Sequence, residues 1–461
     1  MQLEGRNVVV VGLGRSGIAS AQLCLRRGAK VVATDSIARE KAPAQMLALE
    51  GHGATLVLGG HEGVDWAAAD LVVISPGVPP FAALAQVERS GREVIGELEL
   101  ASRLVAAPIA LVGGTNGKST VTTLLGQMLE HGGRKVFAGG NLGTPLAEVV
   151  DEPFDALVLE ISSFQAERIP TLHARAAALL NITDDHLDRY PDFAAYAQAK
   201  GNMFVGMGPQ DVAVIPAGDE VCARQAARGL ARVVTFGPGG QVRAESGWLV
   251  DEVHGWRVEL ASMKLQGAHN ALNACASMAM AAAMGGTEQG ARQALSTFAG
   301  LSHRTVLVGE VGGVRYYDDS KGTNVGAAVA ALRGMREGRA VLIAGGRDKQ
   351  GSYEPLVDTL RERGRALVLI GEAADRIAQA ARGAIAVYRA ATMDEAVQRA
   401  SELAQAGDAV LLSPACSSFD MYKNYAERGD AFAAAVRRLV AGTSPLPAPI
   451  PRSGGEPGGA S

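Results

Sequence analysis

The feature that most constrains the fold of this chain is a glycine-rich turn, Gly113-Gly114-Thr115-Asn116-Gly117-Lys118-Ser119-Thr120. The turn follows an apolar run at residues 108–112 and precedes a helical pattern at residues 121–130. A strand, a glycine turn and a helix in this order point main-chain N–H groups and a helix N-terminus at a phosphate. In such a loop Lys118 reaches the β- and γ-phosphates and Ser119 ligates Mg²⁺. The pattern therefore predicts a nucleoside triphosphate site at residues 114–120.

This loop departs from the strict P-loop pattern by one residue. Val112 stands where the first glycine of the longer pattern would be, so the loop reads G-x-x-x-G-K-S. The alternative interpretation is a structural glycine turn followed by an incidental Lys-Ser pair. The strand before the turn and the helix after it favour the nucleotide site.

Length and composition set the domain count and exclude some partners. A chain of 461 residues, 48% of them hydrophobic, exceeds what one core usually supports, so two to three domains of about 150 residues are expected. The formal net charge of -4 gives no reason to expect nucleic acid or an anionic membrane as partner. We place the domain boundaries at residues 1–104, 105–301 and 302–442, and expect a disordered tail at residues 443–461, which are rich in Pro, Gly and Ser.

Cysteine usage and the N-terminus bear on the cellular compartment. The four cysteines are far apart in sequence and form no metal-binding cluster: Cys24, Cys222, Cys275 and Cys416. Free thiols in a reducing compartment are therefore expected. No secretory signal is visible, and the alanine-rich stretch at residues 271–286 indicates a buried helix and not a membrane span. We expect a monomeric cytoplasmic protein.

The first third of the chain contains a second phosphate-binding pattern. An apolar strand at residues 8–11 leads into Gly12-Leu13-Gly14-Arg15-Ser16-Gly17, and a further strand ends at Asp35. This arrangement opens a parallel βαβ unit and indicates a bound diphosphate near a helix N-terminus. It does not specify the nucleotide, so NAD(P) and a UDP group both remain open, as do purely structural glycines.

Two polar residues follow strands of the central domain. A buried strand ends in Glu160, and a second one leads into the polar cluster Asn181-Ile182-Thr183-Asp184-Asp185-His186. A carboxylate at a strand end in a P-loop domain commonly holds Mg²⁺ or its waters, which makes Glu160 a metal candidate and His186 a site candidate. A solvated glutamate and a structural histidine are the alternatives. Lys200 by its sequence context indicates only an exposed helix position, and Asn270 indicates either a ligand contact or a helix cap.

The last third has the pattern of another α/β domain. Strands are predicted at residues 340–344, 366–370 and 409–412, with helical patterns between them. The residues that follow these strands are charged or carry hydroxyl groups, as at the ligand edge of a parallel sheet. The predicted fold is thus α/β with three domains: Rossmann-like, P-loop ATPase-like and Rossmann-like.

The motifs taken together strongly resemble the Mur ligases of peptidoglycan synthesis. The resemblance extends from the first glycine turn to about residue 440 and rests on G-L-G-R-S-G, G-T-N-G-K-S-T, E-I-S-S-F-Q, N-I-T-D-D-H-L-D-R-Y, H-N-A-L-N, S-H-R, D-D-S-K-G-T-N and S-P-A-C-S-S-F-D. Several of these motifs are shared with other ATP-dependent ligases, including folylpolyglutamate synthase. The competing interpretations are a ligase for another amino acid and an NAD(P) oxidoreductase.

The resemblance implies an activity and its cofactors. ATP would activate the carboxylate of UDP-MurNAc-L-Ala as an acyl phosphate, and the amine of D-glutamate would attack it through a tetrahedral intermediate. Two Mg²⁺ ions would assist, and Lys200 would be carbamylated. The third domain would close over ATP about a hinge near residues 301–303.

The resemblance also implies roles for individual residues. Lys118, His186 and Lys200 would be catalytic. The UDP-linked substrate would be bound by Arg15, Ser16, Asp35, Ser36, Ser75, Asn141 and His186. The metal ligands would be Ser119, Glu160, His186 and Lys200. ATP would be bound by Gly114, Thr115, Asn116, Gly117, Lys118, Ser119, Thr120, Asn270, Arg304, Asp319 and Lys321. D-Glutamate would be bound by Thr323, Lys349, Ser418 and Tyr425. Arg347 and Asp348 depart from the family pattern, so their contacts stay open.

Overall fold

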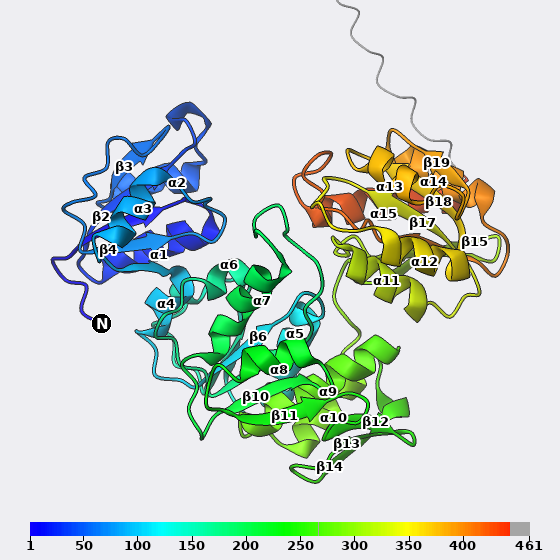
Figure 1. The fold of residues 1–461 in the computed structure, drawn as a ribbon, viewed down its shortest axis with the longest axis horizontal. Coiled ribbons are helices and arrows are strands. Elements are labelled where there is room, and N and C mark those ends of the chain that lie inside the picture. The colour runs from blue at the N-terminus through cyan, green and yellow to red at the C-terminus, as the bar shows by residue number, and fades with distance from the viewer. Residues whose placement is uncertain (266, 443–461) are drawn as a thin grey trace, which may run out of the picture. The chain divides into compact units, whose positions relative to one another are not determined.

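A computed structural model describes residues 1–265 and 267–442 of the chain. It divides into two compact units, Met1–Gly300 and a second unit that begins at Leu301. The first unit contains two β-sheets and the second contains one (Figure 1). The tail expected at residues 443–461 lies outside the described residues. No helix in the described ranges has both the length and the apolar character needed to cross a membrane.

The first sheet is parallel, with the strand order β3-β2-β1-β4-β5. Its strands are β1 (Asn7–Val11), β2 (Lys30–Asp35), β3 (Thr55–Leu58), β4 (Leu71–Ile74) and β5 (Val94–Gly96). The helices of this part are α1 (Arg15–Arg26), α2 (Ala44–Gly51) and α3 (Ala82–Arg89). The chain reverses its direction of winding at β1, between β2 and β4. In an open parallel sheet such a reversal creates a crevice at the carboxyl ends of the strands.

The second sheet has nine strands in the order β14-β13-β12-β11-β10-β9-β6-β8-β7. Its parallel part consists of β6 (Ile109–Gly113), β7 (Val136–Gly140), β8 (Ala156–Glu160), β9 (Ala176–Leu179), β10 (Val212–Pro216) and β11 (Arg232–Phe236). β12 (Val242–Glu245), β13 (Trp248–Asp251) and β14 (Trp256–Glu259) extend it, with antiparallel pairing among themselves. The helices are α5 (Lys118–His131), α6 (Ser163–Ala166), α7 (Phe193–Gly201), α8 (Glu220–Ala226), α9 (Ala268–Ala283) and α10 (Glu288–Thr297).

The third sheet, in the second unit, has the order β15-β16-β20-β17-β18-β19. Its strands are β15 (Val306–Val311), β16 (Val314–Asp318), β17 (Ala340–Gly345), β18 (Gly364–Ile370), β19 (Val387–Arg389) and β20 (Ala409–Leu412). Among the described strands of this sheet, only β15 pairs antiparallel. The helices are α11 (Val325–Gly334), α12 (Glu354–Arg363), α13 (Ala374–Ala380), α14 (Met393–Leu403) and α15 (Tyr425–Val440). The α/β class and the parallel sheets predicted from the sequence are confirmed. The exact domain boundaries stay a prediction.

The helix α4 (Glu97–Ser102) joins the two sheets of the first unit through a buried acid. Glu99 is fully buried, and its carboxylate accepts hydrogen bonds from Thr171 N at 3.1 Å, Leu172 N at 2.9 Å and Arg103 Nε at 2.6 Å. The hydroxyl of Thr171 also donates to it. Because a buried carboxylate is stable only when its lone pairs are satisfied, Glu99 fixes α4 against the segment that leads into β9.

Glu97, at the first position of α4, makes a second connection. Its Oε1 accepts a hydrogen bond from Ala147 N at 2.7 Å, at the short helix η2 (Leu146–Glu148). Burial raises the pKa of Glu97 to about 7, and the nearby Glu148 carboxylate adds to this rise. One short helix therefore holds two buried acids that face different loops of the second sheet.

We expect the substitution Glu99→Ala to lower the free energy of unfolding of the first unit by about 3–5 kcal/mol, because the donors that now bind the buried carboxylate would lose their acceptor. Glu93 is the matched control, since it pairs with the same Arg103 at 2.7 Å from a more exposed position. Glu93→Ala should cost less than about 1 kcal/mol, as surface ion pairs do. Urea denaturation would measure both. Equal effects of the two substitutions would show that Glu99 does not hold this junction.

Candidate active site

The glycine turn lies where the sequence predicted it, between the central strand β6 and the helix α5. Gly117 has φ 86° and Gly114 has φ 136°, which are backbone conformations that L side chains rarely adopt. A Cβ atom at Gly117 would lie only 2.6 Å from Asn273 Oδ1 and 3.2 Å from Leu180 Cδ1. Glycine is therefore required at this position both because the backbone has a positive φ and because a Cβ atom would clash with its neighbours. Because Gly117 caps the helix, α5 begins at Lys118 and not at residue 121 as expected.

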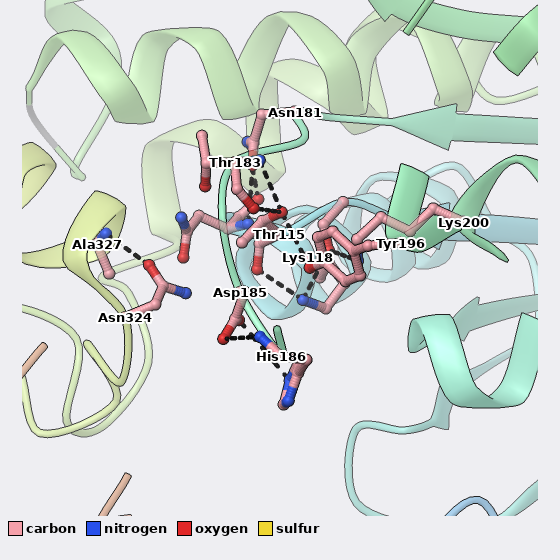
Figure 2. Close-up of polar contacts among 12 residues, drawn as sticks. Thr115, Lys118, Asn181, Thr183, Asp185, His186, Tyr196, Lys200, Asn324 and Ala327 are labelled. Atoms are coloured by element: carbon pink, nitrogen blue, oxygen red, sulfur yellow. Dashed lines mark hydrogen bonds and ion pairs between the residues drawn. The ribbon is translucent and has the colours of Figure 1, made fainter. Parts of the chain in front are cut away.

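Lys118 and Ser119 occupy the first turn of α5. Lys118 Nζ donates hydrogen bonds to the carbonyl oxygens of Gly114 at 2.9 Å and Thr115 at 2.8 Å (Figure 2). The ammonium thus lies against the loop, beside the N-terminus of a helix of 14 residues. Ser119 is buried. A cation and the positive end of a helix dipole at one loop favour an anionic ligand such as a phosphate group.

The segment after β9 fixes the shape of this loop. Asn181 uses both ends of its amide: Oδ1 accepts from Asn116 N at 2.9 Å, and Nδ2 donates to Asn116 O at 3.1 Å. Asn181 O also accepts from Thr115 N at 2.9 Å. Thr115 Oγ1 accepts from Thr183 N at 3.1 Å and lies 3.1 Å from Tyr196 OH (Figure 2). The sequence indicates no role for Asn181, Thr183 or Tyr196 individually, although Asn181 and Thr183 belong to the polar cluster after the strand.

Glu160 and Asn141 meet beside the loop. Glu160 ends β8 opposite Val112, its side chain is 2% exposed, and its Oε1 accepts a hydrogen bond from Asn141 Nδ2 at 2.7 Å. Asn141 N in turn donates to the main-chain oxygen of Glu160 at 2.9 Å. The two predicted site residues are therefore in direct contact. A buried carboxylate next to a phosphate loop is well placed to contribute an oxygen ligand to a divalent cation.

Lys200 is buried, and its predicted exposed position is wrong. It lies on α7 with 4% exposure, and its Nζ donates to Gly114 O at 2.8 Å, the same carbonyl oxygen that Lys118 contacts. Its Nζ also lies 4.6 Å from the centroid of the Tyr196 ring. Burial, and then the charge of Lys118, hold the pKa of Lys200 well below its ordinary value. The prediction of an exposed lysine was wrong because the face of α7 that carries Lys200 packs against the phosphate loop.

His186 lies in the same region, in a left-handed conformation with φ 56°. Its main-chain N donates to Asp185 Oδ1 at 3.0 Å, and its ring meets the ring of Phe164 edge-on with centroids 4.9 Å apart. Figure 2 shows His186 and Asp185 next to the loop residues. Non-glycine residues in this conformation are uncommon and concentrate at functional positions.

A pocket of about 500 Å³ lies at the carboxyl ends of the first sheet. It is lined in part by five residues that the sequence analysis assigned to UDP binding: Arg15, Ser16, Asp35, Ser36 and Ser75. His61 and Phe81 also line it, with ring centroids 4.7 Å apart in a stacked arrangement. These two aromatic rings were not predicted, because nothing in their sequence context marks them as pocket residues.

Asp35 has a structural role in this pocket that the sequence did not indicate. Its Oδ2 accepts from Leu13 N at 2.6 Å and its Oδ1 from Ile37 N at 2.9 Å. Oδ2 therefore holds the glycine turn, while Oδ1 holds the main chain just after Asp35 itself. Arg15, the first residue of α1, pairs with Glu148 at 3.2 Å and donates to Thr144 Oγ1 at 3.3 Å.

The second unit contains the remaining candidates except Asn270, which is in the first turn of α9 in the first unit. Asp319 follows β16 and is buried: Oδ2 accepts from Ser413 Oγ at 2.7 Å, and Oδ1 accepts from Thr305 N at 3.1 Å. Burial raises the pKa of Asp319 to about 7. Lys321 Nζ lies 3.7 Å from the centroid of the Tyr425 ring.

The loops that carry the D-glutamate candidates Lys349 and Ser418 are joined in the second unit. Arg347 and Ser417 form an isolated antiparallel bridge, with Arg347 N donating to Ser417 O at 2.9 Å. Thr323 precedes Asn324, whose side chain caps α11. Among the described ranges, no three His, Cys, Asp or Glu side chains gather into a metal-binding group.

Comparison with known proteins extends over almost the whole chain. Residues 6–96 match the Mur ligase MurD-like N-terminal domain, residues 112–281 the Mur ligase middle domain, and residues 303–416 the Mur ligase glutamate ligase domain. The UDP-N-acetylmuramoylalanine--D-glutamate ligase of Desulfosudis oleivorans is 45% identical, with 96% of this chain and 98% of that protein covered. The enzyme of the same name from Geotalea daltonii is 43% identical, with 96% and 99% covered.

Solved structures share the fold at low sequence identity. A pseudomurein peptide ligase type C from Methanothermus fervidus has a TM-score of 0.60 and 17% identity, covering 94% of this chain and 100% of that chain. UDP-N-acetylmuramate-alanine ligase MurC from Thermotoga maritima has a TM-score of 0.57 and 19% identity, covering 95% and 100%. These likenesses support the α/β architecture of the chain.

We expect Asn181→Ala to weaken ADP binding about tenfold, because the loop loses two hydrogen bonds that fix the main chain of Asn116. Asn181→Asp keeps an acceptor for Asn116 N but removes the donor to Asn116 O, so its effect should be intermediate. Isothermal titration calorimetry with ADP and Mg²⁺ would measure the dissociation constants. Unchanged binding by the alanine variant would contradict a role of this amide in shaping the loop.

We expect Asp319 to make stability depend on pH. Its ordinary pKa is 3.8, and the folded value is about 7. Between these values the folded protein keeps a proton that the unfolded chain has released, so stability should fall as the pH rises through this window, by at most about 1.4 kcal/mol per pH unit. Denaturation at several pH values should show a flatter profile for Asp319→Asn. The exposed Asp430 is the control, and Asp430→Asn should keep the slope of the unmodified protein. Equal slopes for all three proteins would refute this assignment.

Proposed function

The chain belongs to the Mur ligase family, and we propose that it joins D-glutamate to UDP-N-acetylmuramoyl-L-alanine with hydrolysis of ATP to ADP and phosphate. The main support is that relatives 41–45% identical, over nearly their whole length, are named for this reaction. The phosphate loop with Lys118, Ser119 and buried Glu160 agrees with use of a nucleoside triphosphate. The comparisons do not favour the oxidoreductase or a ligase for another amino acid.

The chemistry follows from the low reactivity of a carboxylate. Its carbon is a poor electrophile, so a carboxylate oxygen of the UDP-linked substrate first attacks the γ-phosphorus of ATP, and the bond from that phosphorus to the β,γ-bridging oxygen breaks. ADP leaves, and the acyl phosphate remains. The neutral amine of D-glutamate then attacks the acyl carbon, a tetrahedral intermediate forms, and inorganic phosphate leaves as the amine proton is lost. Lys118 contributes positive charge near the transferred phosphoryl group.

The residues around the phosphate loop fit a Mg²⁺ site. Ser119 and Glu160 offer hard oxygen ligands, and Mg²⁺ is usually held by one or two carboxylates together with substrate phosphates. We assign Ser119 and Glu160 to one ion, and His186 with Lys200 to the region of a second. Mg²⁺ bound there would neutralise charge on the phosphate oxygens.

Carbamylation of Lys200 is part of this proposal. Its burial and the proximity of Lys118 favour the neutral amine, and this is the form that can add carbon dioxide. The product would be an anionic carbamate, which suits a site for a divalent cation better than a second ammonium does.

The pocket of the first sheet is proposed for the UDP group. Its glycine turn and the N-terminus of α1 provide donors for a diphosphate, and Arg15 and Ser16 lie at that helix start. Asp35 contributes by holding the turn through Leu13 N. We further propose that the enzyme acts on this nucleotide-linked substrate in the cytoplasm.

The test is phosphate release by purified protein with ATP, Mg²⁺ and UDP-N-acetylmuramoyl-L-alanine. We expect release to depend on D-glutamate and to be far slower with L-glutamate or other amino acids. Chelation of Mg²⁺ should abolish it, and Lys118→Met should lower the rate by about 10²- to 10³-fold, since that charge supports the transition state. Lys135→Met, which removes an exposed lysine from the same part of the chain, should retain activity. Release that is independent of D-glutamate, or full activity of Lys118→Met, would refute the proposed function.

A further inference from the structure

The loop after β17 carries Lys349, a candidate for binding D-glutamate, and the residues on both sides of this lysine are fixed by other elements. Before it, Arg347 N donates to Ser417 O at 2.9 Å, and Ser417 N donates back to Arg347 O at 3.2 Å. The contact is close: a Cβ atom at Gly346 would lie 2.2 Å from Ser417 O. These bonds join the loop of Lys349 to the loop of Ser418.

The next residue, Asp348, receives hydrogen bonds from several directions. Its Oδ1 accepts from Gln350 N at 3.1 Å and from Tyr353 OH at 2.8 Å. Its Oδ2 pairs with Arg376, which α13 carries. The Asp348 carboxylate therefore organises the turn that contains Lys349.

Arg376 spans this turn from outside. While one guanidinium nitrogen pairs with Asp348, Nη2 donates to Gly351 O at 2.8 Å, and the guanidinium lies 5.3 Å from the centroid of the Tyr353 ring. Asp348 and Gly351 flank Lys349 and Gln350, so a single planar group holds both ends of the segment. A guanidinium is suited to this because its donors have a fixed geometry and its face packs on aromatic rings.

The ion pair of Asp348 and Arg376 also balances charge next to Lys349. Burial raises the pKa of Asp348, but the hydrogen bonds from Arg376 and Tyr353 outweigh it, so the pKa lies below its ordinary value. Asp348 is thus an anion next to Lys349, which is expected to bind an amino acid with two carboxylates. The positive charge of Arg376 offsets the repulsion that Asp348 would exert on such a ligand.

We propose that Arg376 is a positioning residue for the amino-acid substrate, which it serves by holding the turn of Lys349 at Asp348 and Gly351 and by neutralising Asp348. This inference rests on the proposed function, since it takes Lys349 to bind D-glutamate. It assigns a role to a residue of α13 that is absent from every motif in the sequence analysis.

The test compares steady-state kinetics of the purified full chain. Arg376→Ala should raise the KM for D-glutamate about tenfold, because the loop must be ordered on binding and Asp348 is left uncompensated. The KM values for ATP and for UDP-N-acetylmuramoyl-L-alanine, and the kcat at saturating D-glutamate, should change less than about twofold. Arg376→Lys keeps the positive charge but loses the planar guanidinium that contacts Asp348 and Gly351 together, so its effect should be smaller. Arg389→Ala is the control. It removes an exposed arginine of β19 that pairs with Asp375 of α13, and it should leave all kinetic constants unchanged.

A double-mutant cycle separates positioning from general damage. Asp348→Asn should also raise the KM for D-glutamate, and the double variant with Arg376→Ala should show less than the product of the two effects, because both act through one contact. An unchanged KM for D-glutamate in Arg376→Ala, an equal rise in all three KM values, or independent effects in the cycle would overturn the inference while unmodified protein still turns over D-glutamate. Lack of D-glutamate turnover by unmodified protein would instead refute the proposed function.

Discussion

The carbonyl oxygen of Gly114 accepts hydrogen bonds from two lysines, at 2.9 Å from Lys118 and 2.8 Å from Lys200. This shared acceptor connects α5, which follows the loop, with α7, which lies much later in the chain. It also brings two amines close together in a buried place, which favours loss of one proton, and Lys200 is the more buried of the two. The shape of the loop, the ionisation of Lys200 and the position of α7 are therefore linked through one atom.

One candidate acid from each of the three sheets lies at or just beyond the carboxyl end of a parallel strand. Asp35 ends β2, Glu160 ends β8 and Asp319 follows β16. Parallel strands present their carboxyl ends at one edge, so side chains distant in sequence become neighbours there. Each of these acids is then held by donors from an adjacent loop, as Asn141 holds Glu160 and Ser413 holds Asp319.

The sequence was sufficient for the parts of the fold and site that depend on local patterns. A strand, a glycine turn and a helix can be recognised in order, and the structure has such a turn before Lys118 and a pocket lined by Arg15 and Asp35, whose ligands stay a prediction. It was not sufficient where a polar side chain binds distant main chain. Asn181 binds the main chain of Asn116, 65 residues away in sequence, and no residue spacing predicts such a contact. Lys200 looked like a surface residue because a lone lysine in an alanine-rich helix has no feature that shows which face is buried. Arg376 was overlooked for a similar reason, as its partners are set by how α13 packs.

The two acids of α4 have a consequence for dissecting the protein. The N-terminal family match ends at residue 96, directly before α4, and this end suggests a site for truncation. Yet Glu97 and Glu99 are buried against Ala147, Thr171 and Leu172, and the hydrophobic core runs without a break from Leu3 and Val8 to residues of the second sheet. Severing the chain at that point would keep both acids with the second sheet, but it would separate Gly96 N from its acceptor Arg168 O, 2.9 Å away, and expose apolar surface of the shared core on both fragments. The first 300 residues are thus best treated as one piece in expression and in recombination with relatives, whereas the segment from Leu301 onward forms its own compact unit.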